Sequence, residues 1–300
     1  MNKEQLTALV AEILGQMEPP VKAADYRPTA PQPEKSAQPY HDGDFVPDIT
    51  QLDLRKLYLT EEPADKARFA KMKERTPARL GSGKAGPRYK TLTMLRFRAD
   101  HAAARDAVFS EVDTEFAKKH NLLPTKTCCD SKDEYLTRPD LGRRFDEHNA
   151  KAIQGVINTP PKVQIVIGDG LSAAAIEANA MDCLYALKDG LQAKNIPTGQ
   201  DIFVKYCRVG AGDAIGDITG CELVCVLIGE RPGLVTDKSM SIYITYKPHT
   251  GVSESSRTVI SNIHAQGTPA VEAGAYAAEL IEKILQKKVS GVGLHLEAAQ

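Results

Sequence analysis

Polar side chains that could do chemistry stand directly after three short apolar runs in the second half of the chain. The runs are residues 163–167, 223–228 and 258–263, and they end in the glycine-containing loops GDGLS, GERPGL and HAQGTP. Short runs rich in Val and Ile are typical of strands buried on both faces, and open α/β sheets bind ligands at the carboxyl ends of such strands. We therefore expect the three loops to face one ligand. The polar side chains that they would offer are Asp169, Glu230, Arg231 and His264.

The composition of the chain fits a soluble enzyme component in a reducing compartment. Its 300 residues carry a formal net charge of −1, which disfavours a bulk polyanion as partner, and 42% of them are hydrophobic, which allows a sizeable core. Six cysteines, two adjacent and four in or beside apolar segments, favour buried thiols over a disulfide framework. Cys221 and Cys225 have no nearby His, so we expect no zinc site. No segment approaches the ~20 apolar residues of a membrane span.

The first eighteen residues predict an amphipathic helix that a linker separates from the rest of the chain. Apolar residues recur on one helical face, and Pro19 and Pro20 end the helix. The face consists of Leu6, Leu9, Val10, Ile13, Leu14 and Met17. Residues 19–51 are rich in Pro, Ala and charged residues with almost no apolar pattern, which is typical of a flexible linker. The helix would dock either on this protein's own surface or on another protein, and the pattern leaves both open.

Residues 52–150 predict a small, mainly helical domain with a basic surface. Between residues 55 and 105 there are fourteen Lys or Arg against five Asp or Glu, a difference of +9 in a chain whose total is −1. A partner-facing surface explains this excess better than nucleic acid does, because aromatic residues suited to base stacking are sparse there. The stretch GSGKAGPR at residues 81–88 lacks the first Gly and the final Ser or Thr of a phosphate-binding loop, so a turn is the simpler interpretation.

Residues 151–300 alternate between strand and helix patterns, which predicts an α/β fold. Besides the three apolar runs, strands are expected at residues 202–206 and 241–246, and Ser172 can cap a helix that runs to about residue 194. Thr268 as N-cap and Pro269 as first residue would start the final helix. Its expected buried stripe is Val271, Ala275, Ala278, Ile281 and Leu285. The alternation predicts a doubly wound, mostly parallel sheet, although the GxGxxG spacing of a dinucleotide site is missing.

Five segments, in order along the chain, carry a resemblance to one enzyme family. They are RADHAAARDAVFSEV (98–112), YLTRPDLGRR (135–144), VQIVIGDGLSAAAI (163–176), GERPGL (229–234) and RTVISNIHAQGTPAVEA (257–273). From about residue 86 to the C-terminus, the chain resembles the small (light, β) subunit of adenosylcobalamin-dependent ethanolamine ammonia-lyase.

The resemblance implies a lyase complex that converts ethanolamine to acetaldehyde and ammonia through a radical derived from adenosylcobalamin. In this family the substrate and the radical lie in the large subunit, so no residue of this chain is expected to be catalytic. The chain would instead help to enclose the cofactor at the interface with the large subunit in a hetero-oligomer, because a cofactor can carry the chemistry while the protein holds it in position.

The family's cobalamin contacts correspond to Val209, Glu230 and Val259 in this chain. Val259 departs from the family pattern, since some relatives have Cys there, and this favours a main-chain or packing contact. The Glu230 carboxylate would accept hydrogen bonds from the amide arms or the ribose hydroxyl of the cofactor, or form an ion pair with Arg208 or Arg231. Arg208 itself would meet a phosphate or amide oxygen of the cofactor, or a salt-bridge partner at the interface.

Two other polar residues have plainer interpretations. The DxHxxG segment through which a protein histidine ligates cobalt is absent, since Asn262 stands where the Asp would be, so we expect base-on cobalamin and a structural His264. Asp169 would cap the helix that follows Gly170. We predict no metal site within this chain.

The resemblance also gives the N-terminal helix a role. Enzymes of this kind are commonly packaged in microcompartments in the bacterial cytoplasm, so residues 1–18 resemble an encapsulation peptide that binds shell proteins. Two other functions remain open, a stand-alone α/β enzyme acting on a nucleotide or sugar phosphate and a non-catalytic adaptor. The first would need a Ser-His-Asp or paired-carboxylate motif, which we do not find, and the second would bind no cofactor.

Overall fold

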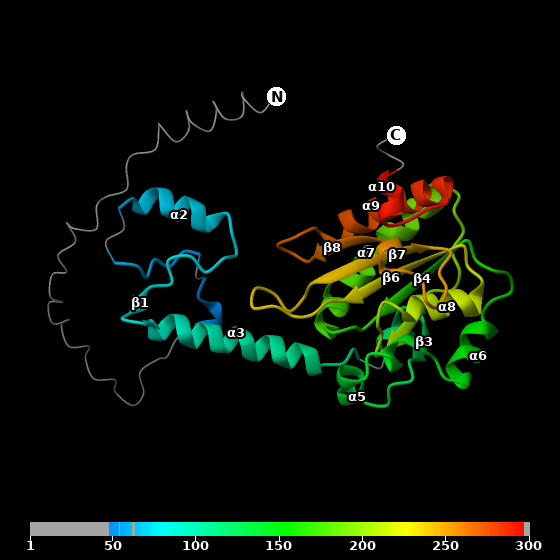
Figure 1. Ribbon diagram of the computed structural model, residues 1–300, viewed down its shortest axis with the longest axis horizontal. Helices are drawn as coiled ribbons and strands as arrows, with labels where there is room; N and C mark the ends of the chain where they lie inside the picture. The colour runs from blue at the N-terminus through cyan, green and yellow to red at the C-terminus, as the bar shows by residue number, and fades with distance from the viewer. Residues whose placement is uncertain (1–47, 54, 62–63, 114, 297–300) are drawn as a thin grey trace, which may run out of the picture. The chain divides into compact units, whose positions relative to one another are not determined.

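The structure, a computed structural model, describes residues 48–296 apart from residues 54, 62–63 and 114. The predicted amphipathic helix (1–18) and most of the predicted linker (19–51) lie outside the described residues. Helices and a two-stranded hairpin make up most of the first part of the described chain (Figure 1). These elements are η2 (Ile49–Gln51), α2 (Lys66–Glu74), β1 (Lys84–Ala85), β2 (Arg88–Tyr89), α3 (Thr91–Phe109), α4 (Phe116–Lys119), α5 (Lys132–Thr137), η3 (Leu141–Arg143) and α6 (Glu147–Gly155).

The main sheet contains six strands in the order β3-β5-β4-β6-β7-β8. They are β3 (Leu123–Lys126), β4 (Val163–Gly168), β5 (Ile202–Lys205), β6 (Leu223–Gly229), β7 (Met240–Tyr246) and β8 (Arg257–Ile263). The first four strands in the sheet are parallel to one another, whereas β7 is antiparallel to both β6 and β8. The protein is therefore a mixed α/β protein with a mostly parallel sheet, as the sequence predicts.

Helices pack on both faces of this sheet (Figure 1). The later helices are α7 (Ala173–Ala193), α8 (Ala211–Thr219), η4 (Glu254–Ser256), α9 (Ala270–Lys287) and α10 (Val292–Leu296). Successive residues of a strand point to opposite faces, so Ile165 of β4 belongs to the apolar cluster with α7 and α9, and Val166 belongs to the cluster with α6 and α8. Both faces of β4 are buried, which explains its mostly apolar sequence. Its one polar residue, Gln164, is also buried and donates a hydrogen bond to the backbone oxygen of Gln200 at 2.7 Å.

The five strands predicted from the sequence agree with the structure to within two residues at each end. The sixth strand, β3, was not predicted. β3 lies in the range 52–150, which we predicted to be mainly helical, and it pairs in parallel with β5 as the edge strand. Its sequence, LPTK, is too short and too polar to form an apolar run. The sheet consequently begins before residue 151. Strand β5 ends one residue earlier than predicted, because Tyr206 has a φ of 57°.

The capping prediction for α7 is confirmed, whereas the one for α9 is wrong by one residue. Ser172 Oγ accepts a hydrogen bond from the backbone N–H of Ala175 at 3.1 Å, and α7 ends before Lys194. Helix α9 begins at Ala270, and Pro269 rather than Thr268 occupies its N-cap position.

The predicted buried stripe of α9 is also partly wrong. Val271 is 56% exposed and Ala275 is exposed as well. The buried residues are instead Ala273, Gly274, Ala277, Ala278, Ile281, Ile284 and Leu285. Gly274 explains why the buried face of α9 differs from the predicted one, since a Cβ at Gly274 would overlap the carbonyl oxygen of Cys183 in α7. The helix turns its smallest residues toward α7 so that the two backbones can approach closely.

The remaining sequence-level expectations concern membranes and thiols. No described helix is long and apolar enough to cross a membrane. All six cysteines are free, and all but Cys128 are buried. Burial raises the pKa of Cys207 and Cys225 well above the ordinary value, which keeps both thiols protonated and unreactive.

The contact of Gly274 with α7 predicts a specific stability effect. Gly274→Ala should lower the free energy of unfolding by about 1–3 kcal/mol, because the added methyl group forces the two helices apart. The matched control is Gly155→Ala in α6, where a Cβ would meet no atom within 4 Å, and this change should be neutral or stabilise by up to about 1 kcal/mol. Urea unfolding of the two variants checks the difference. Equal stability of both would contradict the tight packing of α9 on α7.

Candidate functional site

The loops after β4, β6 and β8 meet at one edge of the sheet. β4 and β6 are parallel, and Gly168 pairs with Ile228 at their carboxyl ends. Because β7 lies antiparallel between β6 and β8, the start of β7 at Met240 pairs with Gly229 of β6 and with Ile263 of β8. The GDGLS, GERPGL and HAQGTP loops therefore share an edge, as we expected from the sequence.

Asp169 is a buried structural residue of this edge and not the cap of α7. The residue is 1% exposed, and its Oδ1 accepts a hydrogen bond from the backbone N–H of Cys207 at 3.1 Å. Burial raises the pKa of the Asp169 carboxyl, and the nearby Lys132 opposes this effect. Gly170 has a φ of +59°, and a Cβ on it would overlap the carbonyl oxygen of Gly229. Glycine therefore permits the first two loops to pack against each other.

His264 is held within its own turn. The residue is 9% exposed, its Nε2 lies 2.9 Å from Asn262 Oδ1, and its Nδ1 accepts the backbone N–H of Gln266 at 3.2 Å. With Nδ1 as acceptor, the neutral ring carries its proton on Nε2 and donates it to Asn262. Both ring nitrogens are engaged, so His264 has the structural role that we expected.

Glu230 is bonded to a tyrosine that the sequence analysis did not identify. The Tyr243 hydroxyl donates a hydrogen bond to Glu230 Oε1 at 2.7 Å. Burial, and then the Glu230 carboxylate, raise the pKa of Tyr243, so the hydroxyl remains a donor. Within the described residues neither Arg208 nor Arg231 bonds Glu230, which rules out the ion pair that we considered from the sequence. The carboxylate therefore keeps Oε2 for a further donor.

The three predicted contact residues are related through Tyr243. Tyr243 pairs with Val259 of β8 and with Val226 of β6, so the side chains of Tyr243, Val259 and Val226 point to the same face of the sheet. Val209, just before α8, packs against the same apolar cluster as Tyr243. Val259 is 46% exposed. Val209, Glu230 and Val259 thus border one partly open face beside α8.

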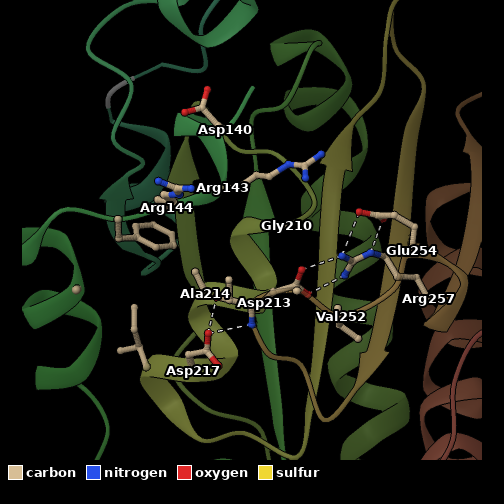
Figure 2. Close-up of a pocket in the computed structure, with 15 residues that line it drawn as sticks. Asp140, Arg143, Arg144, Gly210, Asp213, Ala214, Asp217, Val252, Glu254 and Arg257 are labelled. Atoms are coloured by element: carbon tan, nitrogen blue, oxygen red, sulfur yellow. Dashed lines mark hydrogen bonds and ion pairs between the residues drawn. The ribbon is translucent and has the colours of Figure 1, made fainter. Parts of the chain in front are cut away.

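A pocket of about 690 Å³ extends along α8 on this face, and Gly210 is among its lining residues, whereas Val209, Glu230 and Val259 are not (Figure 2). At its base, Arg257 donates to both carboxylate oxygens of Asp213, at 2.7 and 2.8 Å, and to Glu254 at 2.7 Å. Burial would lower the pKa of Arg257, but the hydrogen bonds that it donates to the Asp213 and Glu254 carboxylates outweigh this effect and raise the pKa. The pair Asp213–Arg257 joins α8 to the start of β8 and fixes one wall of the pocket.

Arg208 lies against the segment YLTRPDLGRR. Its guanidinium carbon lies 4.2 Å from the centre of the Tyr135 ring, and its Nη2 donates to the backbone oxygen of Tyr135 at 2.8 Å. The Tyr135 hydroxyl in turn donates to the backbone oxygen of Cys207 at 2.9 Å. A second pocket, of about 600 Å³, lies between α3 and the GDGLS and GERPGL loops. Arg105, Arg208 and Arg231 are among its lining residues.

Sequence reasoning missed three residues of the site: Tyr243, Asp213 and Arg257. Tyr243 has a weak signal, since it is a polar-tipped residue at an alternating position of a predicted strand. Asp213 and Arg257 are 44 residues apart and have no local spacing that relates them. Their ionic contact depends on the antiparallel return of β8 beside β7.

The candidate polar residues of this end of the sheet serve structural contacts. Among the described residues, no group of three or more His, Cys, Asp or Glu side chains could hold a metal ion. The candidate histidine and the buried Asp169 are both engaged in structural hydrogen bonds. The fold is that of a mixed α/β protein, and its candidate site is a partly open face with two pockets beside it.

Comparison with known proteins gives the family. The family model "Ethanolamine ammonia-lyase light chain (EutC)" matches residues 66–295, and the chain belongs to this family. A protein of Clostridium perfringens named "Ethanolamine ammonia-lyase small subunit" is 52% identical over 294 residues, which cover 98% of this chain and 100% of the relative. Proteins of the same name from Clostridioides difficile and Listeria innocua are each 53% identical, with the same coverage. The similarity extends further toward the N-terminus than the segments from residue 86 indicated.

Proposed function

We propose that this chain is the small subunit of an ethanolamine ammonia-lyase, which binds adenosylcobalamin together with a large subunit and supports the deamination of ethanolamine to acetaldehyde and ammonia. The observation that carries the proposal is the membership of the family over residues 66–295. A small subunit implies a large one as its partner, and relatives of nearly the same length carry that name.

The residues of the candidate site fit such a cofactor. Glu230 has one carboxylate oxygen left to accept a bond from an amide arm or a ribose hydroxyl, and hydrogen bonds to a charged group contribute about 1.5–3 kcal/mol each. Val209 and Val259 border the same partly open face and offer apolar contacts. These three residues are our proposed cofactor contacts, and none of them is proposed to be catalytic.

When bound, adenosylcobalamin supplies the radical that begins the deamination. The residues of this chain would hold and orient the cofactor. Tyr243 fixes the Glu230 carboxylate, because its hydroxyl remains protonated and donates to Oε1. The Asp213–Arg257 pair keeps α8, and with it Val209, in register with β8.

The predicted parts of the chain agree with this division of labour. We propose residues 1–18 as a targeting helix for shell proteins of a bacterial microcompartment and residues 19–51 as its linker. Residues 52–150 would form the small, mainly helical part, except that β3 belongs to the main sheet, and residues 151–300 would form the rest of a doubly wound α/β part that contacts cobalamin. Support for the doubly wound arrangement comes from helices on both faces of the parallel strands.

The proposed division of labour is tested by turnover. The purified chain with adenosylcobalamin and ethanolamine should release no ammonia, because it lacks the large subunit that holds the substrate. Addition of the large subunit should restore ammonia release, which a coupled assay measures. Turnover by the chain alone would favour the stand-alone enzyme, and no stimulation of the large subunit by this chain would exclude the proposed function.

The role of Glu230 is tested by cofactor affinity. Glu230→Ala should weaken cobalamin binding to the assembled complex by about 1.5–3 kcal/mol, or roughly ten- to a hundredfold. Glu222→Ala is a matched control, since Glu222 also accepts a hydrogen bond from a tyrosine hydroxyl of β7, that of Tyr246, at 3.4 Å. Glu222 lies just before the first residue of β6, whereas Glu230 follows the last one. Spectrophotometric titration compares the variants. Equal affinities would make the Glu230–Tyr243 bond purely structural.

The targeting role is tested by truncation. Removal of residues 1–18 should change the free energy of unfolding by no more than about 1 kcal/mol and leave the activity with the large subunit intact, because a tethered surface helix adds little to a core. Residues 1–18 fused to a fluorescent protein should concentrate it in shell-bounded particles, whereas residues 19–51 alone should not. Diffuse fluorescence of the first fusion would argue against targeting.

A further inference from the structure

Helix α3 is largely uncovered by the described part of the chain. Of its 19 residues only Thr93 and Ala107 are buried, whereas the large apolar side chains of Met94, Phe97 and Phe109 are 38%, 42% and 49% exposed. Large apolar side chains gathered on one exposed element mark a contact with another protein. Helix α3 therefore has the character of a helix that a partner covers.

One face of α3 lines two pockets. Met94 and Phe97 line a pocket of about 560 Å³, together with the exposed Tyr89. The α3 residues that line the pocket of about 600 Å³ follow at spacings of three or four residues, so they continue the same helical face. These residues are His101, Ala104, Arg105 and Val108. A partner that covers this face of α3 would therefore meet both pockets.

The pocket of about 600 Å³ carries positive charge that its own lining does not offset. Arg105, Arg208 and Arg231 line it, and no Asp or Glu does. Within the described part of the chain, none of these three guanidinium groups pairs with a carboxylate, and Arg208 donates only to a backbone oxygen. The acids next to them in the sequence, Asp106 and Glu230, do not line the pocket, and Glu230 is bonded to a tyrosine of β7.

This charge decides what can cover the pocket. A partner that excluded water from three guanidinium groups without supplying an anion would leave them desolvated and unpaired, which is costly. A carboxylate matches the planar donor fork of arginine with its two oxygens. The apolar part of the same lining, which includes Leu136, Leu171 and Leu234, suits the carbon chain of an acidic side chain and its apolar neighbours.

We propose that the large subunit covers this face of α3 and places the carboxylate of an Asp or Glu between Arg105, Arg208 and Arg231. The inference rests on the function proposed above, which supplies the partner. The excess of Lys and Arg over residues 55–105 extends the same complementarity to an acidic surface.

Two other occupants fit the observations less well. A small anion would neutralise the arginines but leave Met94 and Phe97 exposed. A second copy of this chain that used the same face would bring the same patch against itself across a two-fold axis, and the arginines would then face like charges.

The test measures the affinity between the two purified full-length subunits without cofactor. Arg105→Ala combined with Arg231→Ala should weaken it by roughly ten- to a hundredfold, the loss expected for one charge-assisted hydrogen bond. The corresponding double change to Glu should weaken it further, because like charges then meet. Arg208 is left in place, since its guanidinium packs on the Tyr135 ring and supports the fold. Biolayer interferometry at several salt concentrations measures the affinity, and its salt dependence should be smaller in the alanine variant.

A matched variant separates the pocket from net charge. Lys119→Ala combined with Lys283→Ala removes the same two positive charges from exposed residues that do not line the pocket, and it should bind the large subunit like the wild type. Arg105→Lys combined with Arg231→Lys should recover part of the lost affinity, because charge returns without the planar fork. Arg105 and Arg231 are exposed, so the thermal unfolding midpoint of every variant should match that of the wild type.

Three results would overturn the inference. One is an unchanged affinity of the double alanine variant for the large subunit. Another is an equal loss in the lysine control, which would reduce the effect to net charge. The third is unchanged assembly with a weaker affinity of the assembled complex for adenosylcobalamin, which would assign the arginines to an anionic group of the cofactor. A wild-type chain that does not bind the large subunit would overturn the proposed function itself, and this result is seen before any variant is compared.

Discussion

The buried ion pair between Arg257 and Asp213 is the interaction on which the candidate site depends. The two side chains are only 3% and 8% exposed, and their two parallel hydrogen bonds join the first turn of α8 to the first residue of β8. Loss of one partner from such a pair would leave a buried charge without compensation, at a cost of about 3–5 kcal/mol. Because Asp213 and Arg257 both line the pocket, this pair also fixes one of its walls. Glu254 adds a third member on the solvent side.

The strands were predictable because a strand that is buried on both faces consists mostly of apolar residues. Strands β4 and β6 are buried at every residue, so neither can carry a charged side chain and each reads as an apolar run. The loops that follow them need glycine for a physical reason, since Gly170 and Gly229 bring two backbones together. Strand β3 shows no apolar run, because it is an edge strand of four residues that contains Pro124 and two half-buried positions.

The parts that were not predictable depend on contacts between distant segments. The register of α9 is decided by Gly274 against α7, and an apolar periodicity cannot distinguish this face from the neighbouring one that contains Val271. Tyr243 and Glu230 lie on opposite sides of the loop between β6 and β7, so their bond appears only once the hairpin is formed. The family resemblance gave Val209, Glu230 and Val259 for the site, but it did not give Tyr243.

Burial is distributed unequally along the chain, and this agrees with the proposed division of labour. Of the described residues between 48 and 110, only Lys73, Thr93 and Ala107 are buried, whereas the two main apolar clusters draw almost entirely on residues after 110. Ordering a residue costs about 1–2 kcal/mol of backbone entropy, which burial must offset. A region with so few buried side chains gains little of this from its own chain. Its exposed apolar residues, among them Leu95 and Phe97 on α3, together with its excess of Lys and Arg, give it the character of a surface that is completed by a partner. The large subunit of the proposed complex is a partner of that kind, whereas the proposed cofactor contacts lie in the part of the chain that has its own buried core.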